Sequence, residues 1–184
     1  MPVTINGDGS ITGLSVGGLG SGVVNTATLA DGAATGVKQG AGSVIQVKYA
    51  QTKSNFTQTS SSYQNVSNLN VSITPTSSSN LLLFQYNMIV RVRENNSHGA
   101  FAWIAISDDA GSSYLAENYH RSYDYAGDGC DLDCGACSYA IKTAGSTSAR
   151  TYYIYMKLGD GDSYEVNPAG NQNNSAVTVM EIKV

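Results

Sequence analysis

Apolar and polar residues alternate along most of this chain, beginning at Val44. The longest such run, 82–92, places its apolar residues on one face and Gln85, Asn87 and Arg91 on the other. Shorter runs rich in β-branched and aromatic residues repeat the pattern at 45–49, 69–73, 101–107, 114–125, 138–142, 151–158 and 177–184. A period of two residues is typical of half-buried antiparallel strands, so the sequence predicts about eight of them.

Clusters of turn-forming residues separate these runs. They lie at 76–80, 94–99, 108–113, 126–135, 145–149 and 159–174. No segment shows a helical period, so the pattern predicts an all-β fold, an antiparallel β-sandwich with jelly-roll-like or Greek-key connections. A closed β-barrel is the alternative. The residues expected in the core are 81–84, Trp103, Ile104, Ile106, Ile154, Met156, Met180 and Ile182.

The first 43 residues are of a different kind. They contain eleven of the twenty glycines, no aromatic residue, and three charges, at Asp8, Asp31 and Lys38. Ordering so much glycine is entropically costly, and the apolar residues are small and few, so the segment has too little to close a core by itself. Apolar residues nevertheless recur throughout it, which a Gly/Ser linker would lack. We therefore expect two parts, an extended segment 1–43 that other chains stabilise and a β-sandwich at 44–184.

The charge of the chain narrows the choice of partners. The net charge is −4, and the ten basic residues are scattered, which argues against a nucleic-acid partner. No apolar run approaches the ~20 residues of a membrane span, so no membrane insertion is expected. The composition is polar and tyrosine-rich, of an extracellular type, yet the start of the sequence lacks the pattern of a secretory signal. A virion protein, assembled in the host cytoplasm and released by lysis, would combine these properties.

Both ends of the chain carry motifs that suggest a family. The opening TINGDGSITGLSVGGL is followed by VNTATLADGAATG, and the last residues are SAVTVMEIKV. These motifs resemble those of small tail-fibre-like and other virion structural proteins of phages that infect cyanobacteria and other aquatic bacteria. In that family an I-x-G-x-G-x-I-x-G-L-x-x-G-G-L leader precedes an A-x-x-L-A-x-G-A-A segment and a compact β domain, and S-x-(I/V)-T-(L/V)-M-E-(I/V) forms the closing strand. The middle of the chain, roughly 52–174, matches only in general style.

The resemblance implies a homotrimeric virion protein. Its leader would pack around a shared axis or dock on other virion proteins of the tail, baseplate or capsid, and the β domain would form a distal knob. A fibre knob would contact the host cell surface, where a glycan is the candidate ligand. Decoration of the capsid, or capping of another fibre, without receptor binding is the alternative. The residues expected to attach the chain to the virion are Ile5, Ile11, Leu14, Val16 and Leu19.

Three cysteines lie close together, at Cys130, Cys134 and Cys137. Zinc requires four nitrogen or sulfur ligands, and His98 or His120 would have to supply the fourth, but the spacing differs from that of paired C-x-x-C sites. A loop disulfide with one odd thiol, or three free thiols in a polar loop, are the alternatives. The cysteines are therefore weak candidates for a metal site, and no cofactor is expected.

Acidic residues gather in two predicted loops and suggest calcium as an alternative to simple turns. They are Asp124, Asp128, Asp131 and Asp133 in one loop and Asp160, Asp162 and Glu165 in the other. Oxygen ligands at alternating positions suit a hard cation. Neither loop has the EF-hand spacing, however, and Gly-Asp pairs are ordinary turn residues, so turn formation is the favoured interpretation.

The stretch 114–125 is the candidate recognition surface. In a strand, Tyr119, Arg121, Tyr123 and Tyr125 would share one face. Tyrosine offers a flat amphipathic surface at low entropy cost, and neighbouring acids can accept hydrogen bonds from sugar hydroxyls. The alternative is that this face belongs to the sandwich core or to a trimer interface, although an arginine fits a core badly.

Catalysis has little support in the sequence. It contains no G-x-S-x-G elbow, no H-E-x-x-H and no phosphate-binding loop, and it has only two histidines. A carboxylate pair such as Glu117 and Asp124 would suit a glycan depolymerase, but polysaccharide-degrading phage spikes usually have a much larger body. We therefore expect a binding or structural protein and not an enzyme.

Overall fold

A computed structural model describes residues 4–5, 7, 11–12, 39–94, 99–123, 130–168 and 174–184. The chain divides into two units, Met1–Gln39 and Gly40–Val184, which are described separately. In the first unit, β1 (Thr4–Ile5) pairs antiparallel with β2 (Ile11–Thr12).

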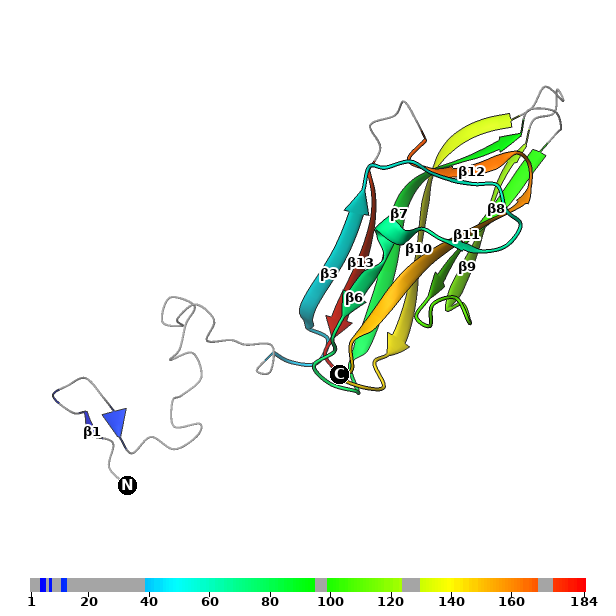
Figure 1. The fold of residues 1–184 in the computed structure, drawn as a ribbon. Helices are drawn as coiled ribbons and strands as arrows, with labels where there is room; N and C mark the ends of the chain where they lie inside the picture. Colours follow the sequence, from blue (N-terminus) through cyan, green and yellow to red (C-terminus); the bar gives the residue numbers. More distant parts are fainter. Residues whose placement is uncertain are drawn as a thin grey trace. The chain divides into compact units, whose positions relative to one another are not determined.

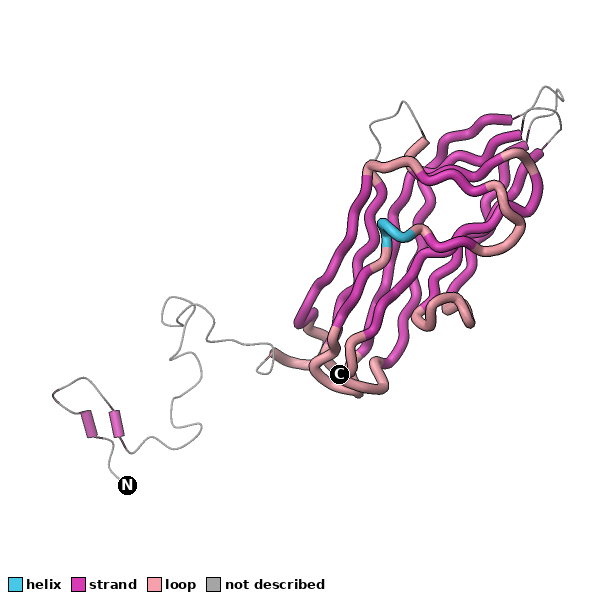
Figure 2. Tube along the Cα trace, in the orientation of Figure 1, coloured by secondary structure: helices cyan, strands magenta, loops and turns pink. Residues whose placement is uncertain are grey.

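The second unit is built from two antiparallel sheets that pack face to face (Figure 1). The larger sheet has six strands, which are β3 (Val44–Thr52), β4 (Phe56–Gln58), β7 (Leu81–Glu94), β10 (Cys130–Thr143), β12 (Ser163–Val166) and β13 (Ser175–Ile182). The smaller sheet has five, which are β5 (Gln64–Asn65), β6 (Val71–Ile73), β8 (Gly99–Ser107), β9 (Ala116–Tyr123) and β11 (Arg150–Asp160). The helical element of the described residues is one short 3-10 turn, η2 (Ser67–Leu69), drawn in cyan in Figure 2. Within this described part, no helix has the length and apolar character needed to span a membrane.

Strand β7 is the central strand of the larger sheet because it pairs with other strands along both of its edges. On one edge its 14 residues pair with β10 over their whole length, from Leu81 opposite Thr143 to Glu94 opposite Cys130. On the other edge its first half pairs with β13 and its second half with β12. Strand β3 extends the sheet beyond β13, and β4 extends it beyond β12.

Strands β8 and β11 form the centre of the smaller sheet. β8 pairs with β11 on one side and with β9 on the other. The short strands β5 and β6 both pair with β11 along its other edge. This arrangement places β9, β8 and β11 side by side, so that one outer face is shared by three strands from distant parts of the sequence.

The core lies between the two sheets and is filled by every second residue of the long strands. In β7 the buried side chains include Leu82, Phe84 and Val90. Phe84 stacks on Tyr152 of β11, with 5.2 Å between the ring centroids. Burying one large apolar side chain contributes roughly 1.5–3 kcal/mol, so this alternation supplies the main stabilisation of the sandwich.

The predicted β-sandwich is confirmed, because the described strands of the second unit form two separate antiparallel sheets. Two of the predicted turn clusters are wrong in part. Strand β10 begins at Cys130, inside the cluster 126–135, and β12 lies inside the cluster 159–174. Both segments are extended because they pair with the far half of β7, a long-range interaction that local composition does not reveal.

Five residues expected in the core lie on outer faces instead. Trp103 is half-buried on the smaller sheet. On the larger sheet Leu81, Leu83, Met180 and Ile182 are half-buried. Each neighbours a fully buried residue of its own strand, such as Ile104 or Val179, and therefore has the opposite orientation. Where both faces of a strand carry apolar residues, alternation alone does not tell which face is inside.

A buried carboxylate connects β13 to β3 and to the loop between β6 and β7. Glu181 of β13 is fully buried. Its Oε1 accepts hydrogen bonds from the side-chain amide of Asn80 (2.6 Å) and from the backbone N–H and hydroxyl of Thr76 (2.8 Å each), while its Oε2 accepts one from the amide of Gln46. Burial by itself raises the pKa of this carboxyl, but the hydrogen bonds from Gln46, Asn80 and Thr76 outweigh it and hold the pKa below its usual range.

We predict that Glu181→Gln lowers the free energy of unfolding by about 2 kcal/mol at neutral pH, because the new amide N–H group faces donors that lose their acceptor. The folded-state pKa of Glu181 is depressed, so its contribution is present above the pKa of the unfolded chain and is lost as the pH falls through the folded value. Denaturant titrations at several pH values should show the wild type and the variant converging in acid. Glu165→Gln, on a half-buried glutamate of the same sheet, is the control and should change little. A difference in the free energy of unfolding between wild type and Glu181→Gln that does not change with pH would contradict this account.

Candidate functional site

The outer face of the smaller sheet carries a group of aromatic rings. In β8, Ala102 and Ile104 point into the core, so Phe101 and Trp103 point outward. Other strands and loops add rings around them. We call this surface the aromatic face, and its rings are those of Tyr63, Phe101, Trp103, Tyr114, Tyr119 and Tyr155.

Three of these rings form a closed triangle across β8 and β9. The Phe101 and Trp103 centroids are 5.2 Å apart, and each lies 5.6 Å from the Tyr119 centroid. The register places Trp103 directly opposite Tyr119, and a cross-strand aromatic pair stabilises a sheet by up to about 1 kcal/mol. Tyr119 is nevertheless 52% exposed, so its ring is available to a ligand.

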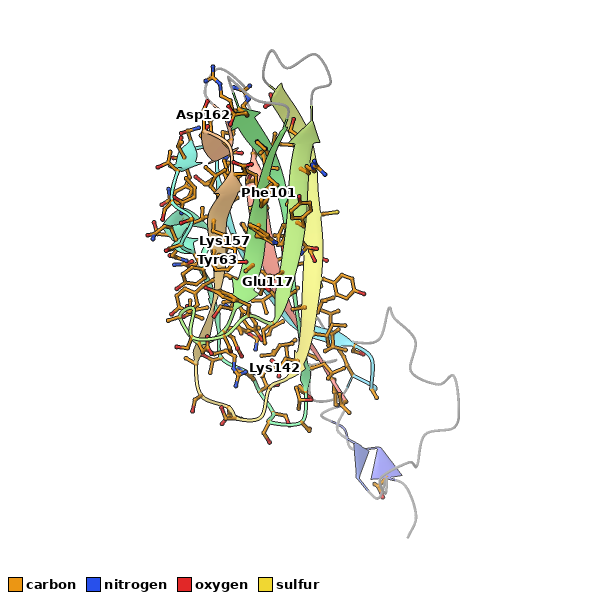
Figure 3. The ribbon with its side chains drawn as sticks, turned by 90° about the vertical axis from the view of Figure 1, so that its right-hand side faces the viewer. Tyr63, Phe101, Glu117, Lys142, Lys157 and Asp162 are labelled. Atoms are coloured by element: carbon orange, nitrogen blue, oxygen red, sulfur yellow. The ribbon has the colours of Figure 1, made fainter. Side chains whose placement is uncertain are left out.

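Lys157 of β11 lies between two rings of the aromatic face. Its Nζ is 4.4 Å from the centroid of the Tyr63 ring and 4.5 Å from that of the Trp103 ring, a cation–π contact with each. The Tyr63 hydroxyl donates a 2.6 Å hydrogen bond to Oε1 of Glu117. Figure 3 looks onto this face, with Phe101, Lys157, Tyr63 and Glu117 following one another along it. Burial first, and then the hydrogen bond and charge of Glu117, raise the pKa of Tyr63 far above its ordinary value, so this hydroxyl keeps its proton.

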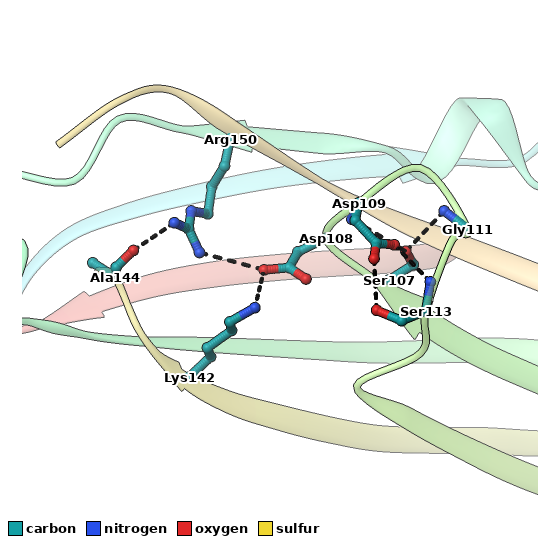
Figure 4. Close-up of polar contacts among 8 residues, drawn as sticks. All are labelled: Ser107, Asp108, Asp109, Gly111, Ser113, Lys142, Ala144 and Arg150. Atoms are coloured by element: carbon teal, nitrogen blue, oxygen red, sulfur yellow. Dashed lines mark hydrogen bonds and ion pairs between the residues drawn. The ribbon is translucent and has the colours of Figure 1, made fainter. Parts of the chain in front are cut away.

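The loop between β8 and β9 is held by a network around Asp109 (Figure 4). Its carboxylate accepts hydrogen bonds from the hydroxyl (2.6 Å) and backbone N–H (2.9 Å) of Ser113 and from the hydroxyl of Ser107 (2.7 Å). These hydrogen bonds, those of the Ser113 hydroxyl and Ser107 foremost, hold the pKa of Asp109 well below its usual range. The loop is therefore closed on itself by an ionised carboxylate.

This loop brings a further tyrosine onto the aromatic face. Gly111 has a φ of +90°, and a Cβ there would lie 2.8 Å from Cζ of Tyr155, so only glycine fits. Tyr114 follows, with its ring centroid 4.4 Å from that of Tyr63 and 5.9 Å from that of Tyr155. The aromatic face thus continues from β8 and β9 onto β11.

An ion-pair network fixes the base of the same loop to both sheets (Figure 4). Asp108 accepts hydrogen bonds from Nζ of Lys142 in β10 (2.9 Å) and from Nη1 of Arg150 in β11 (3.3 Å). Arg150 also donates to the carbonyl oxygen of Ala144. The Asp108 side chain is only 7% exposed, so its carboxylate is largely shielded from water, and its two cationic partners hold the loop in one position.

Gly159 makes room for two of the rings. It is the extra residue at the point where the pairing of β11 with β8 shifts register. A Cβ at this position would collide with the rings of Phe101 and Trp103. Beside it lies an open hollow of about 250 Å³, lined by Thr59, Ser61, Leu158, Gly159, Asp160 and Gly161. Hydroxyl and carboxylate groups thus adjoin the aromatic rings.

The site combines flat apolar rings with hydrogen-bonding side chains, some negatively and some positively charged. Glu117 and Asp160 can accept hydrogen bonds, Lys157 and Arg121 can donate them, and the tyrosine hydroxyls can do both. Within the described ranges, no group of three or more His, Cys, Asp or Glu side chains is placed to hold a metal ion. This chemistry suits a ligand that presents both apolar surface and hydroxyl groups.

Two of the four predicted recognition residues lie on the aromatic face. Tyr119 belongs to the ring triangle, and Arg121 is exposed on the same strand, opposite Phe101 in the register. Tyr123 is the last residue of β9, but its side chain, and all of Tyr125, lie outside the described residues. The strand turns Tyr119 away from the sandwich core.

The cysteines are placed on a strand and not in the polar loop that the sequence predicts. All three belong to β10, although the side chain of Cys130 lies outside the described residues. Cys134 and Cys137 are three positions apart and therefore point to opposite faces of the sheet. Cys134 is half-buried, and burial raises the pKa of its thiol, whereas Cys137 is exposed. Both are free thiols.

The acidic residues of the predicted loops have separate local partners. Asp133 accepts two hydrogen bonds from Arg91, of 2.6 and 3.0 Å. Asp160 accepts one from the backbone N–H of Gly161, and Glu165 accepts one from the Ser163 hydroxyl. Three others lie outside the described residues, namely Asp124, Asp128 and the side chain of Asp131. Asp124 is also the residue that would pair with Glu117 in a glycan depolymerase, so that pair is not described either.

The expected virion-attachment residues lie in the first unit. Ile5 and Ile11 are partners in the register of the β1–β2 pair. Leu14, Val16 and Leu19 lie outside the described residues.

Much of the aromatic face is not apparent from the sequence. Trp103 is expected in the core, and Phe101, Lys157 and Gly159 belong to no motif. One signal is present, since Phe101 and Trp103 are two positions apart and must share a face of any strand that contains both. The contribution of β11 depends on sheet order, which the sequence pattern does not give.

Comparisons with known proteins identify no family. No family model and no curated protein matches the chain. Among solved structures, the chain is similar to the Eiger TNF of S. frugiperda at 11% identity and a TM-score of 0.41, over 74% of this chain and 91% of that one. It is also similar to the arabinose-bound α-L-arabinofuranosidase MgGH51 at 11% identity and a TM-score of 0.32, over 80% of this chain but only 24% of the enzyme. Likeness at this level carries no argument about function.

We predict that Gly159→Ala disturbs the aromatic face, because the added methyl group collides with Phe101 and Trp103. Trp103 is the only tryptophan of the chain, so its fluorescence emission reports the displacement directly. The variant should shift that emission and lose roughly 1–3 kcal/mol of stability, as overpacked sites do.

The matched control is Gly135→Ala on β10, where nothing lies within 4 Å of the added Cβ. It should leave both the emission and the unfolding transition as in the wild type. An unchanged Trp103 emission in Gly159→Ala would show that the rings are not packed as described.

Proposed function

We propose that this chain is a structural protein of a bacteriophage virion whose β-sandwich contacts a glycan on the host cell surface through the aromatic face. The observation that carries the proposal is the half-exposed ring of Tyr119 beside Phe101 and Trp103. Acceptors and donors, among them Glu117 and Lys157, lie within the same surface.

A sugar ring has C–H groups on its flat faces and hydroxyl groups around its edge. Aromatic side chains suit the flat faces because they are apolar, planar and stiff, and Tyr and Trp add a donor at the tip. Charged side chains suit the hydroxyl groups, because hydrogen bonds to charged groups are stronger than neutral ones. Glu117 and Lys157 lie close enough to the rings for one ligand to use both kinds of contact.

The aromatic face is already ordered without a ligand, which favours binding. Lys157 is held between two rings, Tyr63 is fixed by Glu117, and the loop that carries Tyr114 is closed by the Asp109 network. Side chains that are already fixed lose little entropy when a ligand binds. A rigid platform of this kind is typical of a recognition surface.

The motifs at the two ends of the chain support the assignment to a virion. The leader resembles the attachment segment of phage fibre-like proteins, and the closing motif corresponds to β13 of the sandwich. A homotrimer anchored by its leader to tail, baseplate or capsid proteins would present three aromatic faces. Multivalent contact raises avidity without new contacts, so a weak affinity for each glycan would suffice for adsorption.

The proposed activity is binding without cleavage. Glu117 accepts the hydrogen bond of the Tyr63 hydroxyl, and the Lys157 ammonium lies over the ring of the same tyrosine, an arrangement that suits a fixed hydrogen-bond acceptor. A glycosidase needs a second carboxylate on the other side of the scissile bond. We propose no such pair of catalytic carboxylates in this chain.

We predict that soluble host-surface glycan changes the Trp103 emission of the full chain and that Tyr119→Ala weakens the affinity by about tenfold, since one aromatic anchor is removed. The free energy of unfolding should fall by no more than about 1 kcal/mol, the most that the cross-strand pair of Trp103 and Tyr119 contributes. Tyr49→Ala is the matched control, a tyrosine 70% exposed on the larger sheet, and should bind a monovalent fragment of the glycan as the wild type does.

The two variants also decide between functions. Equal loss of binding in both would show that the effect is not specific to the aromatic face. Normal glycan binding and normal cell adsorption by Tyr119→Ala would favour the alternative, in which the protein decorates the capsid or caps a fibre without binding a receptor.

A further inference from the structure

The outer face of the larger sheet carries a row of apolar side chains across four strands. Ile141 of β10 is opposite Leu83 of β7, Leu83 is opposite Met180 of β13, and Met180 is opposite Val47 of β3. The two ends of this row are the most exposed, with Ile141 at 56% and Val47 at 50%. An antiparallel sheet with one face in water normally places polar residues there.

The neighbouring row is also apolar over three strands. Leu81, Ile182 and Val44 follow one another in the register, and Val44 is 46% exposed. We call these two rows together the apolar band. Isolated exposed apolar residues are ordinary, but a contiguous patch on the outside of a sheet marks an interaction surface.

The sheet around the apolar band is uncharged. The next row holds Tyr139, Gln85, Thr178 and Tyr49, and the row after that holds Cys137, Asn87, Ala176 and Gln51. Charge returns only in the far half of the same face, for instance at the Arg91–Asp133 ion pair. The half of the outer face that carries the Arg91–Asp133 ion pair is therefore suited to contact with water. The uncharged half, which carries the apolar band, is suited to contact with an uncharged partner surface.

A knob and a hollow lie on this uncharged half. Tyr49, at 70% exposed, stands out on the outermost strand β3. An open hollow of about 500 Å³ lies over β7 and its two neighbours, lined by Gln85, Asn87, Cys137, Tyr139, Ala176 and Thr178 among others. Knob and hollow belong to one face, so two copies of this face present both halves of a contact to each other.

We infer that the uncharged half of this outer face is the surface through which copies of this chain associate, with Tyr49 of one copy seated in the hollow of the next and the apolar bands packed together. The inference rests on the proposed function only for the number of copies. If each copy places Tyr49 in the hollow of the other, the contacts are reciprocal and close a pair. If the contacts run head to tail, they close a ring when the rotation between copies is one third of a turn.

The size of the surface fits this role. With strands about 4.8 Å apart and a rise of about 3.4 Å per residue, the four rows cover roughly 450 Å² in plan. Side chains that stand out from the sheet add to that figure, so two such faces together reach the roughly 1,000 Å² that a specific interface needs. A second copy is also the partner that matches an uncharged surface without any complementary charges.

The position of the face agrees with glycan recognition by the same molecule. The larger sheet and the smaller sheet turn their outer faces in opposite directions, because they pack through their inner faces (Figure 1). Association through the larger sheet therefore leaves the aromatic face open on every copy.

Sedimentation of the full 184-residue chain tests the inference. The wild type should sediment as two or three chains, and Ile141→Glu should weaken association by about a hundredfold, since it would bury an unpaired charge in the contact. Tyr49→Ala should weaken association less. The matched control is Thr57→Glu, which adds the same charge at an exposed position of β4 in the same sheet and should keep the wild-type mass. Circular dichroism should show all variants folded.

A second measurement needs no substitution. Cys137 is an exposed thiol that lines the hollow, so its alkylation by a maleimide should slow by about tenfold when the protein is concentrated enough to associate, as protected thiols do. A wild type that stays monomeric at high concentration, an Ile141→Glu variant that keeps the wild-type mass, or an alkylation rate independent of concentration would each overturn the inference. The Trp103 emission separates this result from the proposed function, because Ile141→Glu should bind soluble glycan normally while Tyr119→Ala should keep the wild-type mass.

Discussion

The register between β7 and β10 is the constraint on which the rest of the sandwich depends. Fourteen consecutive pairs, from Leu81 opposite Thr143 to Glu94 opposite Cys130, fix the orientation of every side chain in the middle of the larger sheet. Because β13 and β12 pair with the other edge of β7, the same register passes on to them. A slip of one residue would exchange the inner and outer faces of the sheet. Core and outer surface are therefore set by the same hydrogen bonds.

Alternation in the sequence predicts most of the strands because it records which residues share a face. It does not record which face is inside. In β8 and β13, Trp103 and Met180 are apolar residues on the outside, and only the packing of the two sheets shows this. The first half of β10, from Cys130 to Gly135, has too few apolar residues to be recognised as a strand and is extended because β7 pairs with it. Errors of prediction thus fall where long-range pairing overrides local composition.

The sequence predicts only the part of the candidate site that lies on one strand, β9. Tyr119 and Arg121 stand out in the sequence because a tyrosine-rich run with an arginine is unusual for a core strand. Phe101 and Lys157 are about 60 residues apart in the sequence. They reach the same surface only because β8 lies between β9 and β11 in the sheet. The role of Gly159 cannot be predicted from the sequence either. It depends on the rings of Phe101 and Trp103 that lie against it, and not on its own neighbours in the chain.

The two proposed roles make opposite physical demands on the two outer faces of one sandwich. A surface that copies of the chain cover must be free of charge, because a charge buried without a partner is costly. A surface that meets a hydrated, hydroxyl-rich ligand gains from charge, because Glu117 and Lys157 stay partly solvated and can still form strong hydrogen bonds. A single-layer sheet could not meet both demands, since its second face would have to form the core. Two sheets packed face to face can, because their inner faces supply the core and leave two outer faces free to differ. The sandwich is thus suited to the two proposed roles, association with its own copies on one side and recognition of a foreign surface on the other.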